Sequence, residues 1–193
     1  MAISVEFAEK LSTGGGSKYF SLKNDKDFAM VRLMYNSLDE ITGSIYGVHY
    51  TDDGKFECKR TTGTEPVSDC PLCQSGSQSK AVLFLNLYNI ETKEILVWER
   101  TWSWVKGNII PNVNEALEGN GDRKICEFPL KIVRNGASGD MKTTYNLFFK
   151  TPDGTTLDTL GERPNAPIKQ IGSQSESNAP VADNSGSDLF RGM

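Results

Sequence analysis

Four side chains that bind transition metals lie close together in the first half of this 193-residue chain. Zinc is held in structural sites by four ligands in a tetrahedron, and three cysteines with one histidine form a common closed set. The Cys-Pro-Leu-Cys knuckle places two thiolates on one tight turn, and a hairpin at Asp52-Asp53-Gly54 would bring the other two ligands close. The spacing therefore predicts one structural zinc ion. The expected ligands are His49, Cys58, Cys70 and Cys73.

Other interpretations of the cysteines stay open. Cys126, the fourth cysteine, lies in an apolar run and competes with His49 as the fourth ligand, although a core position suits it better. A CxxC pair can also be a redox motif, but that motif belongs in a βαβ context, which the pattern lacks. Free cysteines are in addition often simply buried as small apolar side chains.

Catalytic motifs are missing. The chain has a single histidine, so a Ser-His or Cys-His mechanism would have to use His49. There is no GxxxxGK[ST], GxSxG or HExxH motif, and Gly14-Gly15-Gly16 lacks the lysine of a phosphate loop. Asp52-Asp53 suits a turn better than a two-metal site. We expect no catalytic residues and a protein that is not an enzyme.

Composition narrows the class of protein further. The net charge is -4 and 37% of the residues are hydrophobic, which suits a modest globular core. Apolar runs are far shorter than the roughly 20 residues that cross a membrane, and acids stand where a secretory signal would be basic. We therefore expect no membrane association and a cytoplasmic protein whose cysteines stay reduced.

The elements that must position the metal ligands are mostly strands. Short β-rich runs separated by turns predict a mainly β fold, a small barrel. Residues 104–117 are expected to be helical in part, with Pro111 breaking or beginning the helix. Strands are predicted at 28–35, 44–51, 55–60, 81–88, 95–100, 128–134 and 143–150.

The two ends of the chain differ in composition from its middle. Residues 1–16 form an arm that ends in Gly14-Gly15-Gly16, and 17–160 form the domain, with the zinc module at about 44–76. Residues 161–193 are rich in serine and contain one aromatic residue, which predicts a disordered tail. Its acidic and apolar end would dock replication partners. The docking residues are Asp183, Asp188, Leu189 and Phe190.

A family resemblance rests on four short pieces between Lys23 and Gln74. They are Leu22-Lys23-Asn24-Asp25, Val48-His49, Asp53-Gly54-Lys55-Phe56 running into Cys58, and Asp69-Cys70-Pro71-Leu72-Cys73-Gln74. This stretch resembles the zinc-containing single-stranded DNA-binding proteins of T-even and other tailed phages. The resemblance implies zinc on the histidine and three cysteines, and an OB-fold that carries the DNA. The T-even protein has a basic N-terminal arm, whereas here Glu6 and Glu9 offset Lys10 and Lys18. In place of its long acidic C-terminal domain, this sequence has a short, weakly acidic tail.

Cations and aromatic residues suited to binding single strands occur in three clusters, at residues 123–150, 98–104 and 55–60. A sequence-independent groove needs cations for phosphates and aromatic faces for bases. Between Arg123 and Lys150 there are six cations and two acids. Strand alternation would place Trp98, Arg100, Trp102 and Trp104 on one face, although most such aromatics are core residues in other proteins. The candidate DNA contacts are Tyr46, Lys55, Lys59, Arg60, Arg100, Trp102, Lys131, Arg134 and Tyr145.

Together these observations predict a protein that coats and protects single-stranded DNA during phage replication, recombination and repair. It would act in the cytoplasm of the bacterial host, and its tail would dock a phage polymerase, helicase or recombinase. The alternative is a zinc-ribbon protein-interaction module in transcription or replisome assembly. A nuclease, or another enzyme with an undetected site, is the third hypothesis.

Overall fold

The computed structural model describes residues 18–140, 142–155 and 157–171. Its strands form one mixed sheet with the order β1-β6-β5-β2-β7-β8, and β3 joins the sheet between β5 and β4. Only β1 and β6 pair in parallel. The strands are β1 Lys18–Tyr19, β2 Phe28–Leu33, β3 Ile45–Thr51, β4 Gly54–Glu57, β5 Lys80–Asn89, β6 Ile95–Thr101, β7 Leu130–Asn135 and β8 Thr144–Phe149.

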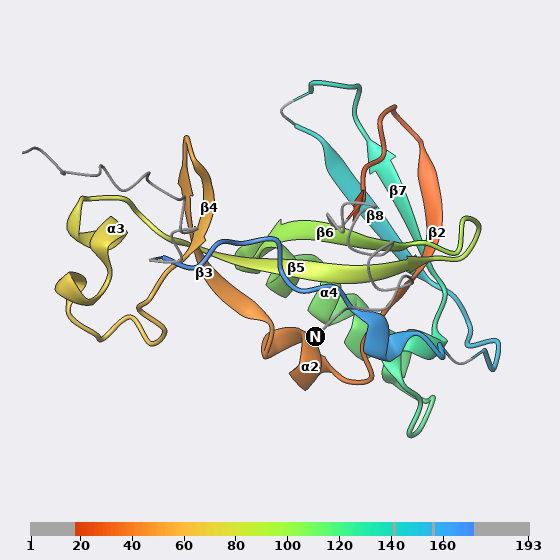
Figure 1. The fold of residues 1–193 in the computed structure, drawn as a ribbon. Coiled ribbons are helices and arrows are strands. Elements are labelled where there is room, and N and C mark those ends of the chain that lie inside the picture. Colours follow the sequence, from red (N-terminus) through yellow and green to blue (C-terminus); the bar gives the residue numbers. More distant parts are fainter. Residues whose placement is uncertain (1–17, 141, 156, 172–193) are drawn as a thin grey trace, which may run out of the picture.

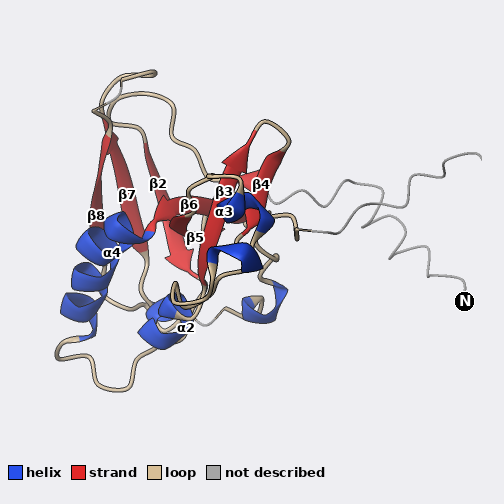
Figure 2. Cartoon of the chain, turned by 90° about the vertical axis from the view of Figure 1, so that its left-hand side faces the viewer, coloured by secondary structure: helices blue, strands red, loops and turns tan. Residues whose placement is uncertain are grey.

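Short helices connect the strands, and one longer helix covers the sheet. In α4, the residues Val105, Ile109 and Val113 recur at helical spacing and are buried. Figure 2 shows α4 lying beside β7 and β8. The helices are α2 Leu38–Thr42, α3 Pro71–Gln74 and α4 Trp102–Leu117, with 3-10 turns η1 Val67–Asp69, η2 Ile125–Glu127 and η3 Leu160–Glu162.

The main core lies on the inner face of the sheet, which we define as the face covered by α4. Alternation along β2 buries Val31 and Leu33 on this face, together with Leu83 and Leu85 of β5. On the outer face, Val82 and Phe84 of β5 form a second cluster with Val48 and Val97. Both faces of the central strands are therefore apolar.

The fold is mainly β, as expected, but the sheet is not a closed barrel. Among the described residues β8 pairs only with β7, so its other edge has no strand. The sheet curls enough for the rings of Trp98 on β6 and Tyr145 on β8 to lie 5.3 Å apart. Side chains and α4 thus fill the gap that backbone hydrogen bonds would close in a barrel.

The predicted strands pair in three hairpins, β3–β4, β5–β6 and β7–β8, and two local predictions are wrong. The β6 strand ends at Thr101 and α4 begins at Trp102, so Trp102 and Trp104 do not continue the strand face. Pro111 lies inside α4 and does not end it. An internal proline costs about 3 kcal/mol, and the buried stripe on both sides of it offsets that cost.

The chain after Leu160 is ordered as far as Ile171, so the predicted tail begins too early. Lys169 bridges in parallel to Phe56, next to β4, and its backbone exchanges hydrogen bonds of 2.9 Å with Glu57 and Lys55. Ala166 and Ile168 pack on the second cluster. We call residues 164–170 the strap. This packing explains its order, because the strap covers apolar side chains of the central strands.

Two predicted features lie outside the described residues. They are the N-terminal arm, 1–16, and the docking end of the tail at Asp183, Asp188, Leu189 and Phe190. Within the described residues, no helix combines the length and the apolar character needed to cross a bilayer.

Candidate metal centre and nucleic-acid groove

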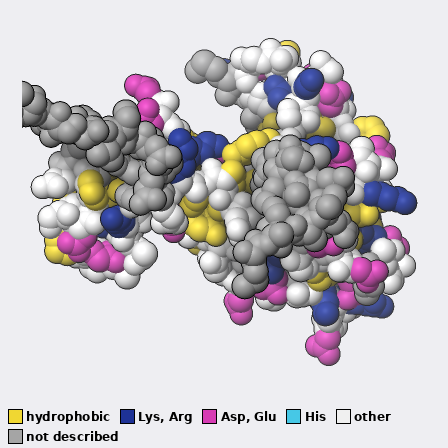
Figure 3. Space-filling view, in the orientation of Figure 1, with side chains coloured by type: hydrophobic (Ala, Val, Ile, Leu, Met, Phe, Trp, Pro, Cys, Tyr) yellow, Lys and Arg dark blue, Asp and Glu magenta, His cyan; other side chains and the backbone are white. Residues whose placement is uncertain are grey.

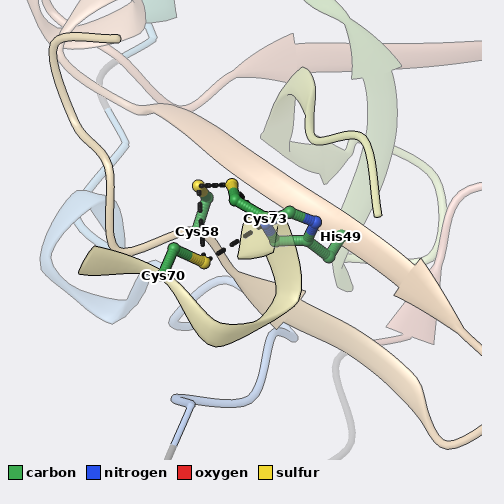
Figure 4. A group of neighbouring side chains, drawn as sticks. All are labelled: His49, Cys58, Cys70 and Cys73. Atoms are coloured by element: carbon green, nitrogen blue, oxygen red, sulfur yellow. Dashed lines mark hydrogen bonds between the residues drawn. The ribbon is translucent and has the colours of Figure 1, made fainter. Parts of the chain in front are cut away.

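The structure brings the four predicted zinc ligands together (Figure 4). His49 comes from β3, Cys58 follows β4, and the knuckle at the start of α3 supplies Cys70 and Cys73. Their ligand atoms all lie within 4.8 Å of one another. The Cys58 sulfur is 4.0 Å from that of Cys70 and 3.6 Å from that of Cys73. The His49 Nε2 atom is 3.5 Å from each of the two knuckle sulfurs.

These distances match a tetrahedral zinc site. Zinc–sulfur bonds of about 2.3 Å and zinc–nitrogen bonds of about 2.0–2.1 Å put neighbouring sulfurs about 3.8 Å apart, and sulfur and nitrogen about 3.6 Å apart. The donor set also suits zinc, because soft thiolates with one imidazole select it over hard cations. His49, Cys58 and Cys70 are buried, so few positions remain for water. The geometry is that of a closed structural site.

Neighbouring groups orient the ligands. The Nδ1 atom of His49 lies 3.1 Å from the Ser77 hydroxyl, which leaves Nε2 free to face the three sulfurs. Burial disfavours the thiolate of Cys70, but backbone N–H groups of Cys73 and Lys59 donate to it and outweigh burial. Together with the Leu72 N–H they lower the pKa of Cys70 to about 6. The knuckle thus stabilises a thiolate, the form that binds metal.

Cys126 does not belong to this cluster. It is buried against Met34 and Leu157 in a small core of its own. Burial raises the pKa of its thiol, so it stays a neutral, apolar side chain. The structure therefore brings His49, and not Cys126, to the three other cysteines.

A groove of about 750 Å³ crosses the free edge of β6. The β3–β4 hairpin and the loop between β7 and β8 rise on either side of it (Figure 1), and the surface is hollowed between them (Figure 3). Beyond Val97, β6 has no partner on this edge among the described residues, so side chains from both faces of the sheet reach the groove. Its lining includes Trp98, Arg100, Trp104 and Tyr145 from the inner face, and Tyr19, Tyr50 and Glu99 from the outer face.

Arg100 stands at the centre of three aromatic rings. Its guanidinium carbon lies 4.3 Å from the ring centre of Trp98, 4.6 Å from that of Tyr145 and 5.2 Å from that of Trp104. Burial lowers the pKa of Arg100, but an arginine stays charged at neutral pH. It forms no ion pair with any described residue. The rings hold a positive charge in the groove that no described carboxylate pairs with directly.

The opposite wall carries an ion pair and a hydrogen-bonded tyrosine. Glu99 pairs with Lys55 and accepts a 2.6 Å hydrogen bond from the Tyr50 hydroxyl. Burial and that hydrogen bond to Glu99 raise the pKa of Tyr50. Burial disfavours the ammonium of Lys55, but Glu99 and Tyr19 outweigh it and raise its pKa. Tyr19 and Tyr50 remain 48% and 42% exposed, so their ring faces are accessible.

The metal ligands and this wall lie on opposite faces of one hairpin. Tyr50 and Lys55 are cross-strand partners, and the next pair is His49 with Phe56. Since successive side chains of a strand alternate, the first pair faces the groove and the second pair faces the metal ligands. A metal bound by His49 would thus stabilise the β3–β4 hairpin from the face opposite Tyr50 and Lys55.

The predicted DNA contacts do not form one surface. Arg100 and Tyr145 line the groove, and Lys55 reaches its wall through Glu99. Arg134 also lines it, but its guanidinium donates to the carbonyls of Leu22, Gly136 and Ala137. Arg134 therefore fastens the β7–β8 loop.

The remaining candidates lie elsewhere. Lys131 points to the outer face of the sheet, because Leu130 and Ile132 on either side of it are buried in the core. Trp102 and Tyr46 are half-buried and pack on the two apolar clusters. Lys59 is exposed beside the metal ligand Cys58, and Arg60 donates to the carbonyls of Gly63 and Glu65. Phe128, interleaved with the cations in the sequence, is a core residue.

The candidate DNA contacts left out Tyr19, Lys80 and Tyr50, of which Tyr19 and Tyr50 line the groove. Tyr19 enters only because β1 pairs with β6, a contact between distant segments. Lys80 lies 5.7 Å from the ring centre of Tyr50, across the β3–β5 ladder. Tyr50 itself had a usable signal, because it stands opposite Lys55 across the Asp52-Asp53-Gly54 turn.

Comparisons of this chain with protein-family models, curated proteins and solved structures found no match. The inference of function therefore rests on the residues of the metal centre and the groove, together with the resemblance of the 23–74 stretch.

Proposed function

We propose that this protein binds single-stranded DNA without sequence preference, along the groove, and that His49, Cys58, Cys70 and Cys73 hold one structural zinc ion. The protein would coat and protect single strands during phage replication, recombination and repair, with no covalent chemistry. The tail beyond Ile171 would dock a polymerase, helicase or recombinase. The setting and the tail follow from the resemblance and the composition, and the binding mode follows from the groove.

The observation that carries this proposal is the Arg100 cluster. A guanidinium without an acidic partner, held among three aromatic rings in an open groove, suits a nucleic-acid backbone with its bases. Trp98 is 2% exposed and serves as support. Tyr19, Tyr50 and the half-buried Tyr145 offer ring faces on which bases of any sequence can stack.

Zinc binding supports the same function indirectly. Holding His49 and Cys58 together would fix the pairing of β3 with β4, and with it Tyr50 and Lys55 on the groove side. A rigid wall lowers the entropy lost when a strand binds. The metal would have a structural role and no contact with DNA, because its ligands face away from the groove.

Fluorescence titration with oligo(dT) at several salt concentrations tests the proposal. We expect tight binding that weakens with salt, with a slope of roughly -0.7 per neutralised phosphate. Arg100→Ala should make that slope shallower, and Tyr50→Ala should cost about 1–3 kcal/mol of binding energy. Lys106→Ala is the matched control, because Lys106 is exposed on α4 outside the groove.

Two outcomes would contradict the proposal. Equal affinity for duplex and single strands would favour the protein-interaction module over single-strand binding. An equal effect of Arg100→Ala and Lys106→Ala would remove the groove as the binding site. Metal-dependent cleavage of the oligonucleotide would instead support the nuclease hypothesis.

A further inference from the structure

A second aromatic and cationic surface lies on the outer face of the sheet, away from the groove. Phe28 on β2 is 54% exposed and Phe148 on β8 is 48% exposed. Between them is Lys131 of β7, whose ammonium lies 4.3 Å from the ring centre of Phe28 and whose cross-strand partner is Phe148. We call these three residues the outer platform.

The outer platform is the uncovered part of an otherwise covered face. Farther along β2, Arg32 also points outward, but it donates to the Glu127 carbonyl and pairs with Asp153. The next outward residue, Met34, is buried under Leu157. The coverage therefore ends before Phe28.

The chemistry of the outer platform identifies its occupant. Lys131 forms no ion pair with any described residue. A cation at the centre of a patch disfavours a dry protein interface, where charged residues are depleted. Two exposed rings around one ammonium suit bases and a phosphate, as in stacking surfaces for single strands.

Continuity with the groove supports the same occupant. Tyr145 and Phe148 lie on the same strand, β8, with Tyr145 on the groove side and Phe148 on the outer face. Among the described residues β8 pairs only with β7, so no strand lies along its other edge, although α4 packs against the inner side of β8. A single strand that leaves the groove at Tyr145 can turn over this edge onto Phe148.

We propose that the outer platform is a second single-strand binding site, which stacks bases on Phe28 and Phe148 and binds a phosphate with Lys131. It extends the proposed groove function, on which it rests. It also implies that long strands bend around β8, while short strands occupy the groove alone.

Oligo(dT) ladders from about 6 to about 20 nucleotides test this extension with the full-length chain. Phe28→Ala with Phe148→Ala should weaken binding of the long strand at least about 30-fold and leave the short strand unchanged within twofold. Lys131→Gln should make the salt dependence shallower by roughly one phosphate, for the long strand only. Val67→Ala, an exposed apolar residue at the distant metal module, is the matched control.

Further variants separate stacking from other contacts. Phe148→Trp should keep long-strand affinity and Phe148→Leu should lose it, because leucine has no ring face. If leucine preserves the affinity, stacking on a ring does not contribute to binding and our inference is wrong. If a dimer that needs Phe28 and Phe148 forms without DNA, the site is a contact between copies and our inference is also wrong. Equal losses for short and long strands would also overturn it. If Arg100→Ala does not weaken the binding of short strands, the groove is refuted as a binding site. That result leaves the outer platform untouched, because the platform is tested by the difference between long and short strands.

Discussion

Glu99 places a carboxylate where the groove would receive phosphates. Its side chain holds Lys55 and the Tyr50 hydroxyl, so part of the cationic wall is already neutralised within the protein. A bound strand must compete with this carboxylate for Lys55. Glu99 would therefore moderate the affinity of the groove.

Replacing Glu99 with glutamine tests this role. Glu99→Gln keeps a hydrogen-bond acceptor for Tyr50 but frees the charge of Lys55, so oligo(dT) should bind about fivefold tighter, or about 1 kcal/mol. The salt dependence should steepen by roughly 0.7. Glu94→Gln, which removes the acid of the Lys18 pair outside the groove, is the control. Weaker binding by Glu99→Gln would mean that Glu99 positions the wall and does not compete with DNA.

Asp153 makes stability depend on pH. Hydrogen bonds from Arg32, and then from the Thr155 N–H, lower the pKa of Asp153 to about 2 from an ordinary value of 3.8. As the pH falls, the unfolded chain takes up this proton first, so the stabilisation is full above about pH 4 and is lost as the pH falls through about 2. Urea unfolding of Asp153→Asn should show a stability deficit at pH 7 that shrinks between pH 4 and 2.

The exposed Asp158→Asn is the control for that series, because Asp158 has no ion pair among the described residues. Any loss of metal in acid affects all of these proteins alike and cancels in the difference. A deficit of Asp153→Asn that stays constant from pH 7 to pH 2 would exclude this carboxylate as the source.

At the scale of elements, we expect the β3–β4 hairpin and α3 to depend on a zinc ion bound at the candidate metal centre. Cys58, Cys70 and Cys73 come from segments that no long strand connects. Ligands must order to bind zinc, so the binding energy becomes folding energy of this module. We expect one zinc per chain by elemental analysis.

Cysteine variants test the ligand set. Cys58→Ser and Cys73→Ser should lose the metal and increase amide hydrogen exchange in residues 45–77, while the β5–β6 core keeps its protection. Cys126→Ser should keep a full complement of zinc, because Cys126 packs against Met34 and Leu157. Full zinc in both ligand variants would exclude this site.

At the scale of the whole molecule, the strap joins the C-terminal part of the chain to the groove wall. Its backbone bonds to Lys55 and Glu57 extend the sheet beyond β4, and Ile168 covers the second apolar cluster. Residues that follow the domain in sequence therefore support a hairpin near its start.

Two truncations separate the strap from the chain that follows it. Removing residues 164–193 should lower the free energy of unfolding by about 2–4 kcal/mol and weaken oligo(dT) binding, because two backbone hydrogen bonds and apolar cover are lost. Removing only 172–193 should leave folding, zinc and affinity unchanged, apart from slightly tighter binding at low salt, and should abolish capture of a replication partner. Equal stability of both truncations would show that the strap contributes nothing.

Much of the fold follows from local sequence. Alternation and turn residues placed the main strands and their three hairpins, because a strand with one buried face repeats every two residues. The clustering of His49, Cys58, Cys70 and Cys73 was also predictable, since these residues are close in sequence and their types and spacing suit one metal ion. The sequence left Cys126 open as the fourth ligand.

Four properties were decided only by tertiary structure. Trp102 begins a helix, and the strap is ordered, because of burial against segments far away in sequence. The sheet stays open because α4 and aromatic side chains occupy the place of a closing ladder. The cations were separated in the same way. Arg100 lies in the groove, Arg134 binds backbone carbonyls of a loop and Lys131 faces outward. Composition shows which charged residues exist, but packing determines which of them remain free to bind a ligand.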